Sequence, residues 1–356
     1  GANVAGNDTF IGGGAVDTAD YSSDADDLVV DFSGTDSVSG TGIGTDKLDG
    51  VEVVNLGTGN DTFINGASND TINGGSGVDV ADYSGESNDI TADLATGAVT
   101  GTGIGSDILS GFETFLSGTG NDDITGSANA DTISGGSGND VIDGGNGSDV
   151  IDGDAGDDTF IASAGNDTYD GGSDNITGDI LDYSSAGGNV TSGSITSGSG
   201  TITYSTGDTD TISGGIEGYL FNTGDDAISF DTASFGNLNT LDGGGGNDTI
   251  GISGDLTASG GIDGSTIADV FTNVEELDFT SGDINSGDTF DLDLTDLQSI
   301  TGLSDGSGAL TIHIDDSNIT FSEFNITYDG TFDDSTPGQE TYTWSSGESL
   351  TVIDSA

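Results

Sequence analysis

Apolar residues recur at a fixed spacing of nine in the centre of the chain. Between Ser117 and Asp170 the recurring positions hold Ile124, Ile133, Ile142, Ile151, Phe160 and Tyr169. Because successive side chains of a strand point to opposite faces, a very short strand centred on each position would point this apolar side chain inward and its two neighbours outward. Glycine-rich stretches such as Gly144–Ser148 separate these positions and favour turns. The pattern predicts short strands joined by tight turns.

The same nine-residue unit recurs on both sides of this run, in tracts marked by Asp8 and Asp17, by Asp61, Asp70 and Asp79, and by the single copies at Asp226 and Asp248. Two units make one coil of about 18 residues. Coils stacked at the roughly 4.8 Å spacing of neighbouring strands would bury a ladder of Ile, Val and Phe. We therefore expect an all-β fold, a parallel β-solenoid, over residues 1–251.

A longer module interrupts the short one at about residues 21–55, 83–116 and 183–220. The first copy alternates apolar residues at Leu28, Val30 and Phe32, which indicates longer strands that continue the solenoid as wider coils. Each copy contains an Asp-Tyr-Ser triplet near its start and ends near a glutamate, which is Glu52, Glu113 or Glu217. For these glutamates a structural polar contact is favoured over a metal role.

From residue 252 to 356 the repeat fades and longer strand patterns take over. Leu310, Ile312 and Ile314 alternate, and Tyr342 and Trp344 share one face of another expected strand. This β-rich C-terminal region is predicted to cap the solenoid. At the other end the repeat is already in register from Gly6 to Ile11, so an open coil is expected there, which another chain or a preceding segment would cover.

Charge changes this picture. The chain holds 64 acidic residues against one lysine, a formal net charge of −63, together with 65 glycines. Such a chain repels itself and cannot fold on apolar burial alone. The shortage of Lys and Arg argues against nucleic acid and anionic membrane as partners, and no apolar run approaches the roughly 18 residues of a membrane span. The lack of cysteine excludes disulfides and Cys-ligated zinc.

A hard divalent cation would bring the carboxylates together. Ca²⁺ takes about six to eight oxygen ligands and accepts both carboxylates and backbone carbonyls. Turns two units apart would hold an ion between them, with two ions on each edge of the six-unit run. Gly-Asn-Asp is also ordinary turn chemistry, but the nine-residue regularity favours multiple calcium sites. The predicted ligands are Asp8, Asp17, Asp61, Asp70, Asp79, Asp122, Asp131, Asp140, Asp149, Asp158, Asp167, Asp226 and Asp248.

The unit Gly135–Asp143, which reads GGSGNDVID, resembles the GGxGxDxUx repeats of RTX proteins, and six tandem copies make the resemblance specific. It implies a calcium-bound parallel β-roll in a bacterial protein exported by type I secretion. The interleaved longer module is similar to segments of large RTX surface proteins. Surface-layer subunits, extracellular fibres and adhesin stalks are the functions that the resemblance implies.

Signals for catalysis and for other binding functions are thin. Gly302–Gly306 fits GxSxG, but a nucleophile elbow needs a histidine base, and His313, the single histidine, is expected on the outer face of a strand. Ice-binding RTX proteins present Thr-x-Asn in every coil, whereas this chain has Ser137-Gly138-Asn139. Tyr342 and Trp344 could stack on a sugar, although packing within the cap is favoured. The chain is predicted not to be an enzyme.

Together these patterns predict a secreted, extracellular or cell-surface structural protein that binds Ca²⁺ and self-associates into a fibre or lattice. An alternative is the calcium-binding secretion half of a larger RTX enzyme, or the stalk of an adhesin. A third is a module that contacts a glycan or cell surface through residues 252–356. No nucleic acid partner and no membrane insertion are expected.

Overall fold

The computed structural model describes residues 6–173, 178–235, 237–255 and 270–278, and seven strands after residue 281. The chain forms two compact units, residues 1–176 and 177–356. The described elements are strands, β1 to β38, and one short helix, α1 (Thr232–Phe235). The fold is therefore all-β, as predicted. Within the described ranges no helix is long and apolar enough to cross a membrane.

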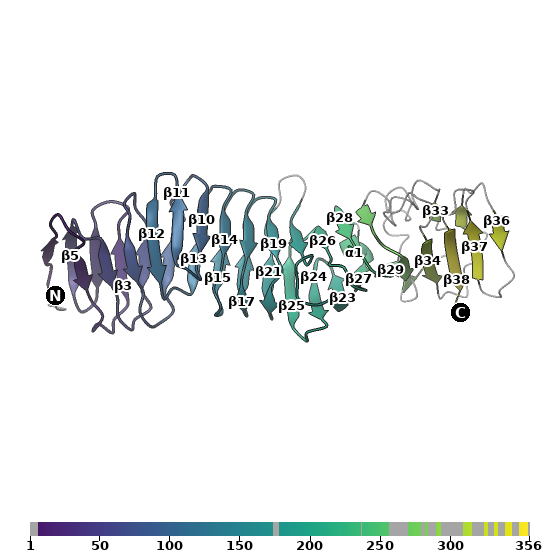
Figure 1. The fold of residues 1–356 in the computed structure, drawn as a ribbon, viewed down its shortest axis with the longest axis horizontal. Coiled ribbons are helices and arrows are strands. Elements are labelled where there is room, and N and C mark those ends of the chain that lie inside the picture. Colours follow the sequence, from purple (N-terminus) through teal and green to yellow (C-terminus); the bar gives the residue numbers. More distant parts are fainter. Residues whose placement is uncertain are drawn as a thin grey trace. The chain divides into compact units, whose positions relative to one another are not determined.

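The first unit is a stack of coils whose strands form two sheets (Figure 1). One sheet contains, in spatial order, β1 (Thr9–Ile11), β5 (Gly44–Asp49), β4 (Ser37–Gly40), β3 (Leu28–Asp31), β7 (Thr62–Ile64), β9 (Val80–Asp82), β13 (Thr114–Leu116), β15 (Thr132–Ser134), β18 (Val150–Asp152) and β21 (Thr168–Asp170). The other contains β2 (Thr18–Asp20), β6 (Val53–Asn55), β8 (Thr71–Asn73), β12 (Gly105–Ser110), β11 (Ala98–Gly101), β10 (Ile90–Asp93), β14 (Asp123–Thr125), β16 (Val141–Asp143) and β19 (Thr159–Ile161). A small extra pair joins β17 (Asn146–Gly147) to β20 (Ala164–Gly165).

The repeat strands pair in parallel with a shift of two repeat units. Ile124 of β14 lies opposite Ile142 of β16, which lies opposite Phe160 of β19. In the facing sheet Ile133, Ile151 and Tyr169 align in the same way. All six side chains are at most 1% exposed. The predicted coil of two units and its inward apolar ladder are confirmed.

The longer modules differ from the wider coils expected of them. In the first, β3, β4 and β5 form an antiparallel meander, so one module inserts three neighbouring strands into a single sheet. The second does the same in the opposite sheet with β10, β11 and β12. Val38 at the centre of the first meander is buried. The Gly-rich turns between the strands let the chain reverse, which alternation alone did not reveal.

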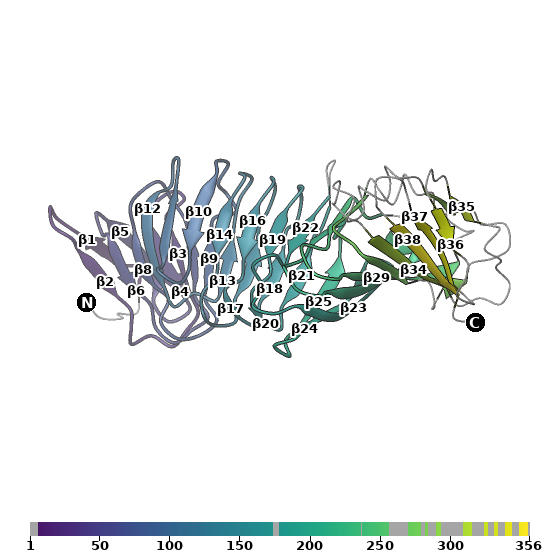
Figure 2. The same ribbon diagram turned by 45° about the vertical axis from the view of Figure 1, so that its right-hand side comes forward.

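The second unit repeats this plan (Figure 2). One sheet contains β22 (Ile180–Asp182), β26 (Gly218–Leu220), β28 (Thr240–Asp242) and β30 (Phe271–Thr272). The other contains β25 (Thr209–Gly214), β24 (Ser199–Tyr204), β23 (Val190–Thr196), β27 (Ala227–Asp231), β29 (Thr249–Asp255), β31 (Glu276–Asp278), β34 (Ala309–Ile314), β38 (Ser349–Asp354), β37 (Gln339–Thr343) and β36 (Thr331–Asp333). Beside these, β32 (Gly282–Asp283) pairs with β29, and β33 (Phe290–Leu292) pairs with β35 (Phe324–Ile326).

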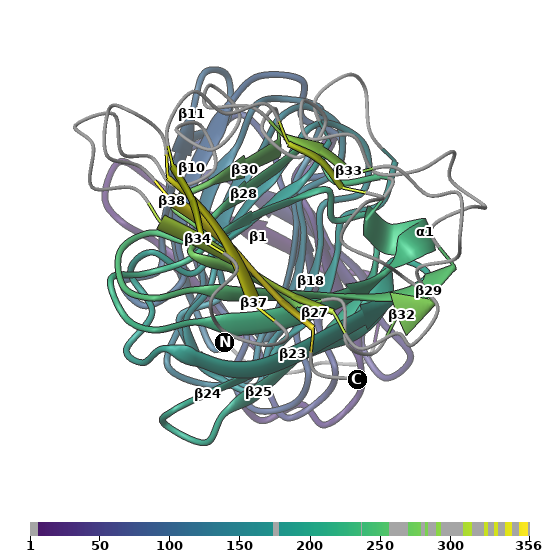
Figure 3. The same ribbon diagram turned by 90° about the vertical axis from the view of Figure 1, so that its right-hand side faces the viewer.

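Most of the described residues of the C-terminal region form strands. Its parallel ladder ends in the antiparallel strands β36, β37 and β38, of which β37 and β38 are labelled in Figure 3. The region's predicted role as a cap, and the boundary after residue 251, stay predictions. Gly302–Gly306, the side chains of His313 and Tyr342, and Trp344 lie outside the described residues.

Candidate metal centre

The repeat aspartates sit in the turns that connect the two sheets. Eleven of the thirteen predicted ligands are buried, whereas Asp17 is half-buried and Asp8 is exposed in the first coil. The buried eleven are Asp61, Asp70, Asp79, Asp122, Asp131, Asp140, Asp149, Asp158, Asp167, Asp226 and Asp248. Burying so many carboxylates is unfavourable unless each is hydrogen-bonded or bound to a cation.

One carboxylate oxygen of each typical repeat aspartate accepts a hydrogen bond from a backbone amide of the preceding coil. The Asp140 Oδ1 atom accepts a hydrogen bond from the Asp122 amide at 2.7 Å, and Asp158 Oδ1 accepts one from the Asp140 amide at 2.8 Å. On the opposite edge Asp149 Oδ1 accepts from the Asp131 amide at 2.9 Å. The repeat of 18 residues therefore places each of these carboxylates against the backbone amide of the corresponding aspartate in the preceding coil.

The second oxygen is left without a partner. Within the described residues, one buried carboxylate oxygen makes no hydrogen bond in each of Asp61, Asp70, Asp79, Asp131, Asp140, Asp149, Asp226 and Asp248. Buried polar atoms of native proteins are almost always paired, so a regular series of unpaired ones indicates a missing ligand. An ionised carboxylate oxygen can only accept, so it needs a hydrogen-bond donor, a proton or a cation; where no donor is in reach, a hard cation fits it.

Glycines in the turns allow carboxylate and carbonyl oxygens of neighbouring coils to come close together. A Cβ atom built on Gly135 would lie 2.6 Å from Asp140 Oδ2 and 3.1 Å from the carbonyl oxygen of Gly153 in the next coil. At Gly136, where φ is +93°, a Cβ atom would lie 2.1 Å from the Gly118 carbonyl oxygen. Glycine is required here both by the positive φ and by the close approach of the coils. The turns thus gather carboxylate and carbonyl oxygens, the donor set that Ca²⁺ prefers.

The electrostatics of the turns agree with a cation site. The pKa of Asp140 is raised to about 7, mainly by burial and in addition by the charges of Asp122 and Asp158, against the lowering effect of the Asp122 amide. Burial likewise raises the pKa of Asp70 and of Asp248 to about 7. In the part of the chain that the structure describes, no group of three or more acidic or histidine side chains is gathered for a metal. Backbone carbonyls would therefore supply much of the coordination.

The longer modules treat their buried aspartates differently. Asp107 Oδ1 accepts a hydrogen bond from the Asp70 amide at 3.0 Å, as a repeat aspartate would, but its Oδ2 accepts one from the Tyr83 hydroxyl at 2.8 Å. Asp46 has the same arrangement with Tyr21, at 3.0 Å. The hydroxyl occupies the position that is unpaired in the repeats, so these turns need no ion at that atom.

At the end of each longer module a glutamate, in place of an aspartate, accepts the hydrogen bond from a backbone amide of the preceding coil. Glu113 Oε2 accepts a hydrogen bond from the Asp79 amide at 3.0 Å, and Glu52 and Glu217 do the same for Asp17 and Asp179. The longer side chain spans a junction in which the coil is not of the regular length. The structural polar contact favoured for Glu52, Glu113 and Glu217 is present in each.

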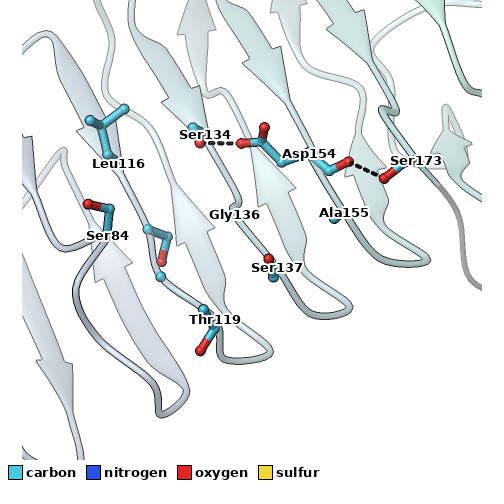
Figure 4. A pocket seen from close by; sticks show the side chains of 11 residues that line it. Ser84, Leu116, Thr119, Ser134, Gly136, Ser137, Asp154, Ala155 and Ser173 are labelled. Atoms are coloured by element: carbon cyan, nitrogen blue, oxygen red, sulfur yellow. Dashed lines mark hydrogen bonds between the residues drawn. The ribbon is translucent and has the colours of Figure 1, made fainter.

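A shallow groove runs along one edge of the central repeats (Figure 4). It has a volume of about 480 Å³ and is lined by small side chains of successive turns, including Ser117, Ser137 and Ala155. Ser134 donates a hydrogen bond to Asp154 across neighbouring turns, which Figure 4 shows as a dashed line. The groove is an open face of stacked turns and brings no catalytic group together.

A family model for the RTX calcium-binding nonapeptide repeat matches residues 48–81, 107–142, 116–151, 143–175 and 238–250. The chain carries RTX calcium-binding nonapeptide repeats. These RTX repeats bind multiple calcium ions, and the matched residues contain most of the buried aspartates described above. The individual ligands remain those that the sequence and the turn geometry predict.

Other comparisons add little. No curated protein sequence matches the chain significantly. Among solved structures, the crystal structure of the extracellular lipase LipA from Serratia marcescens is similar over 65% of this chain, at 16% identity and a TM-score of 0.20. The matched part spans 37% of the lipase chain.

Sequence reasoning missed several buried carboxylates of the longer modules. Asp46, Asp107 and Asp210 are at most 2% exposed and were not singled out, and neither was Asp24. The common TGIG-[ST]-D string before Asp46 and Asp107 was the available signal. Its role becomes visible only when the meander brings each aspartate to a tyrosine about 24 residues away.

Proposed function

We propose that the protein is a structural protein of the bacterial surface or extracellular matrix, whose coils fold on calcium binding and then assemble into a fibre or lattice. The observation that supports this most is the series of buried, unpaired carboxylate oxygens along both edges of the coils. RTX repeats are typically found in secreted proteins, where calcium is abundant.

The physical basis is the coupling of folding to ion binding. A cation that binds only the stacked turns stabilises the folded state, and the stabilisation grows with the logarithm of its concentration above the dissociation constant. In its absence the charge of −63 keeps the chain expanded. At millimolar calcium the turns fill, the charge falls and the coils stack.

Self-assembly is supported by the first described coil. Phe10, in the inward position of β1, is half-buried, whereas Phe63 in the corresponding position of β7 is fully buried. Ile11 and Val16 nearby are 79% and 76% exposed. A second copy of the chain, stacking its own strands on this coil, would cover these apolar groups and continue the sheet, as would a segment that precedes Gly1.

The test is a calcium titration followed by far-UV circular dichroism and light scattering on one sample, with Mg²⁺ as the control ion. We expect β-structure and scattering to rise together. A chain that gains β-structure but stays monomeric in several millimolar calcium would contradict assembly and favour a stalk or the secretion half of a larger RTX enzyme. Glycan contact through residues 252–356 is a separate proposal that a glycan array would test.

A further inference from the structure

The first longer module contains a turn that stacks like a repeat turn although it lacks the repeat sequence. This turn, Tyr21–Leu28, lies on the repeat turn Leu56–Asp61. The Thr58 amide donates to the Asp24 carbonyl oxygen at 3.1 Å. A Cβ atom on Gly57 would lie 2.0 Å from the same oxygen and 3.2 Å from that of Tyr21.

Two successive repeat turns make the same contacts. The Ser76 amide donates to the Gly57 carbonyl oxygen at 2.9 Å, and a Cβ atom on Gly75 would lie 2.2 Å from that oxygen and 3.0 Å from that of Leu56. The turn Tyr21–Leu28 therefore presents its carbonyl oxygens to the following coil as a repeat turn does.

The two kinds of turn differ at the position of the ligand. Asp61 Oδ1 accepts a hydrogen bond from the Leu28 amide at 2.7 Å, just as Asp79 Oδ1 accepts one from the Asp61 amide at 2.7 Å. Leu28 thus stands where a repeat turn has its aspartate. A pair of stacked repeat turns offers an ion two aspartate carboxylates. At this junction the ion would have only one of them, that of Asp61.

Asp24 supplies a carboxylate from another position of the turn. It is 4% exposed, its Oδ1 accepts a hydrogen bond from the Asp26 amide at 2.9 Å, and its Oδ2 has no partner among the described residues. The Oδ2 atom of Asp61, which is fully buried, is likewise unpaired. Burial raises the pKa of Asp61, and the nearby charges of Asp27 and Asp24 raise it further.

We propose that Asp24 and Asp61, with backbone carbonyl oxygens of the turn Tyr21–Leu28, form an additional Ca²⁺ site at the junction between the first longer module and the repeats. Two carboxylates and several carbonyls match the preference of Ca²⁺ for oxygen ligands in a flexible geometry. Asp24 lies outside the residues matched by the repeat family. The assignment rests on calcium binding by the neighbouring repeats and not on self-assembly.

The other two modules lack this carboxylate arrangement. Glu86 occupies the place of Asp24 in the second module, but it is only half-buried and its Oε1 accepts a hydrogen bond from the Asn65 side chain at 3.1 Å. The third module has Ala186 there, which offers no side-chain ligand. The site is therefore specific to the first module.

Equilibrium dialysis of the whole chain against radioactive calcium would count the bound ions. Asp24→Asn keeps an oxygen that can accept the Asp26 amide while removing the carboxylate, and we expect it to bind one ion fewer than the unmodified chain. Asp26→Asn removes an equal charge from an exposed side chain two residues away, and Glu86→Gln removes the corresponding charge of the second module. Both should leave the count unchanged.

An unchanged count in Asp24→Asn, with a wild-type circular dichroism spectrum, would overturn the proposal. If that variant does not fold, crystals of the unmodified chain grown in calcium provide a second test through anomalous difference density. A peak between the carboxylates of Asp24 and Asp61 supports the site, and its absence there contradicts it. Ions at the repeats in the same crystal would show that calcium binding itself holds.

Discussion

At the scale of single residues, the two oxygens of a repeat aspartate have separate tasks. Oδ1 of Asp140 accepts the hydrogen bond of the Asp122 amide in the preceding coil, and the unpaired Oδ2 is the atom predicted to bind calcium. A substitution that preserves the first task and removes the charge needed for the second would separate them.

Asp140→Asn is such a substitution, because an amide oxygen can still accept the Asp122 hydrogen bond. We expect the calcium concentration at half-saturation of this site to rise about 10- to 150-fold, since losing a charged partner costs roughly 1.5–3 kcal/mol. Circular dichroism during a calcium titration measures the change. Asp123→Asn, at an exposed position of the neighbouring coil, should leave the midpoint nearly unchanged, and an equal shift in both variants would count against a ligand role for Asp140.

Acid should partly replace calcium. The pKa of Asp140 and of Asp248 is raised by burial to about 7 in the folded chain, against an ordinary value of 3.8. The calcium-free folded state therefore binds protons that the unfolded state does not. This contribution to stability is fully present below about pH 4 and is lost as the pH rises through 7.

We accordingly expect the calcium-free chain to show more β-structure at pH 5 than at pH 8 by circular dichroism. Saturating calcium should remove most of the difference, because the ion replaces the protons. Equal spectra at both pH values without calcium would contradict the assignment of raised pKa values to the folded turns.

At the scale of elements, the meanders of the longer modules hold their buried carboxylates with tyrosine. Tyr83→Phe would leave Asp107 Oδ2 without its hydroxyl partner. We expect the free energy of unfolding at saturating calcium to fall by about 1–3 kcal/mol, the cost of an unsatisfied buried group. Urea denaturation measures it, and the number of bound ions should not change.

The chain provides a matched control in Tyr219. Its ring is fully buried, and its hydroxyl makes no hydrogen bond within the described residues. Tyr219→Phe should therefore be close to neutral. Equal losses in the two variants would mean that removal of a buried hydroxyl in itself, and not loss of the bond to Asp107, explains the effect.

The elements also show how far the sequence could be interpreted. The nine-residue spacing was enough to predict the strands around Ile142 and Ile151 and their alignment two units apart, because every unit has the same turn followed by the same short strand. It could not predict the meanders, since Leu28 and Val30 alternate equally well in parallel and antiparallel strands. The pairing of Tyr83 with Asp107 depends on that reversal and was hidden for the same reason.

At the scale of the whole molecule, charge and calcium oppose each other. Removing calcium from the folded protein with a chelator should expand the chain, because 64 acidic residues then repel one another. Size-exclusion chromatography with circular dichroism would show a larger hydrodynamic radius and loss of β-structure, both reversed by added calcium. Mg²⁺ should not restore the fold, since it demands a stricter octahedral geometry and releases its water reluctantly; full recovery in Mg²⁺ would contradict a calcium-specific site.

The bonds from each aspartate to the amide 18 residues earlier all run the same way along the chain. Each of these bonds needs the coil that follows in sequence, whereas backbone bonds between stacked turns also run in the other direction. Cutting the run on its C-terminal side would expose backbone amides to water, and cutting it on the N-terminal side would expose carboxylate oxygens. The two ends of the stack therefore present different chemical groups, donors at one and acceptors at the other.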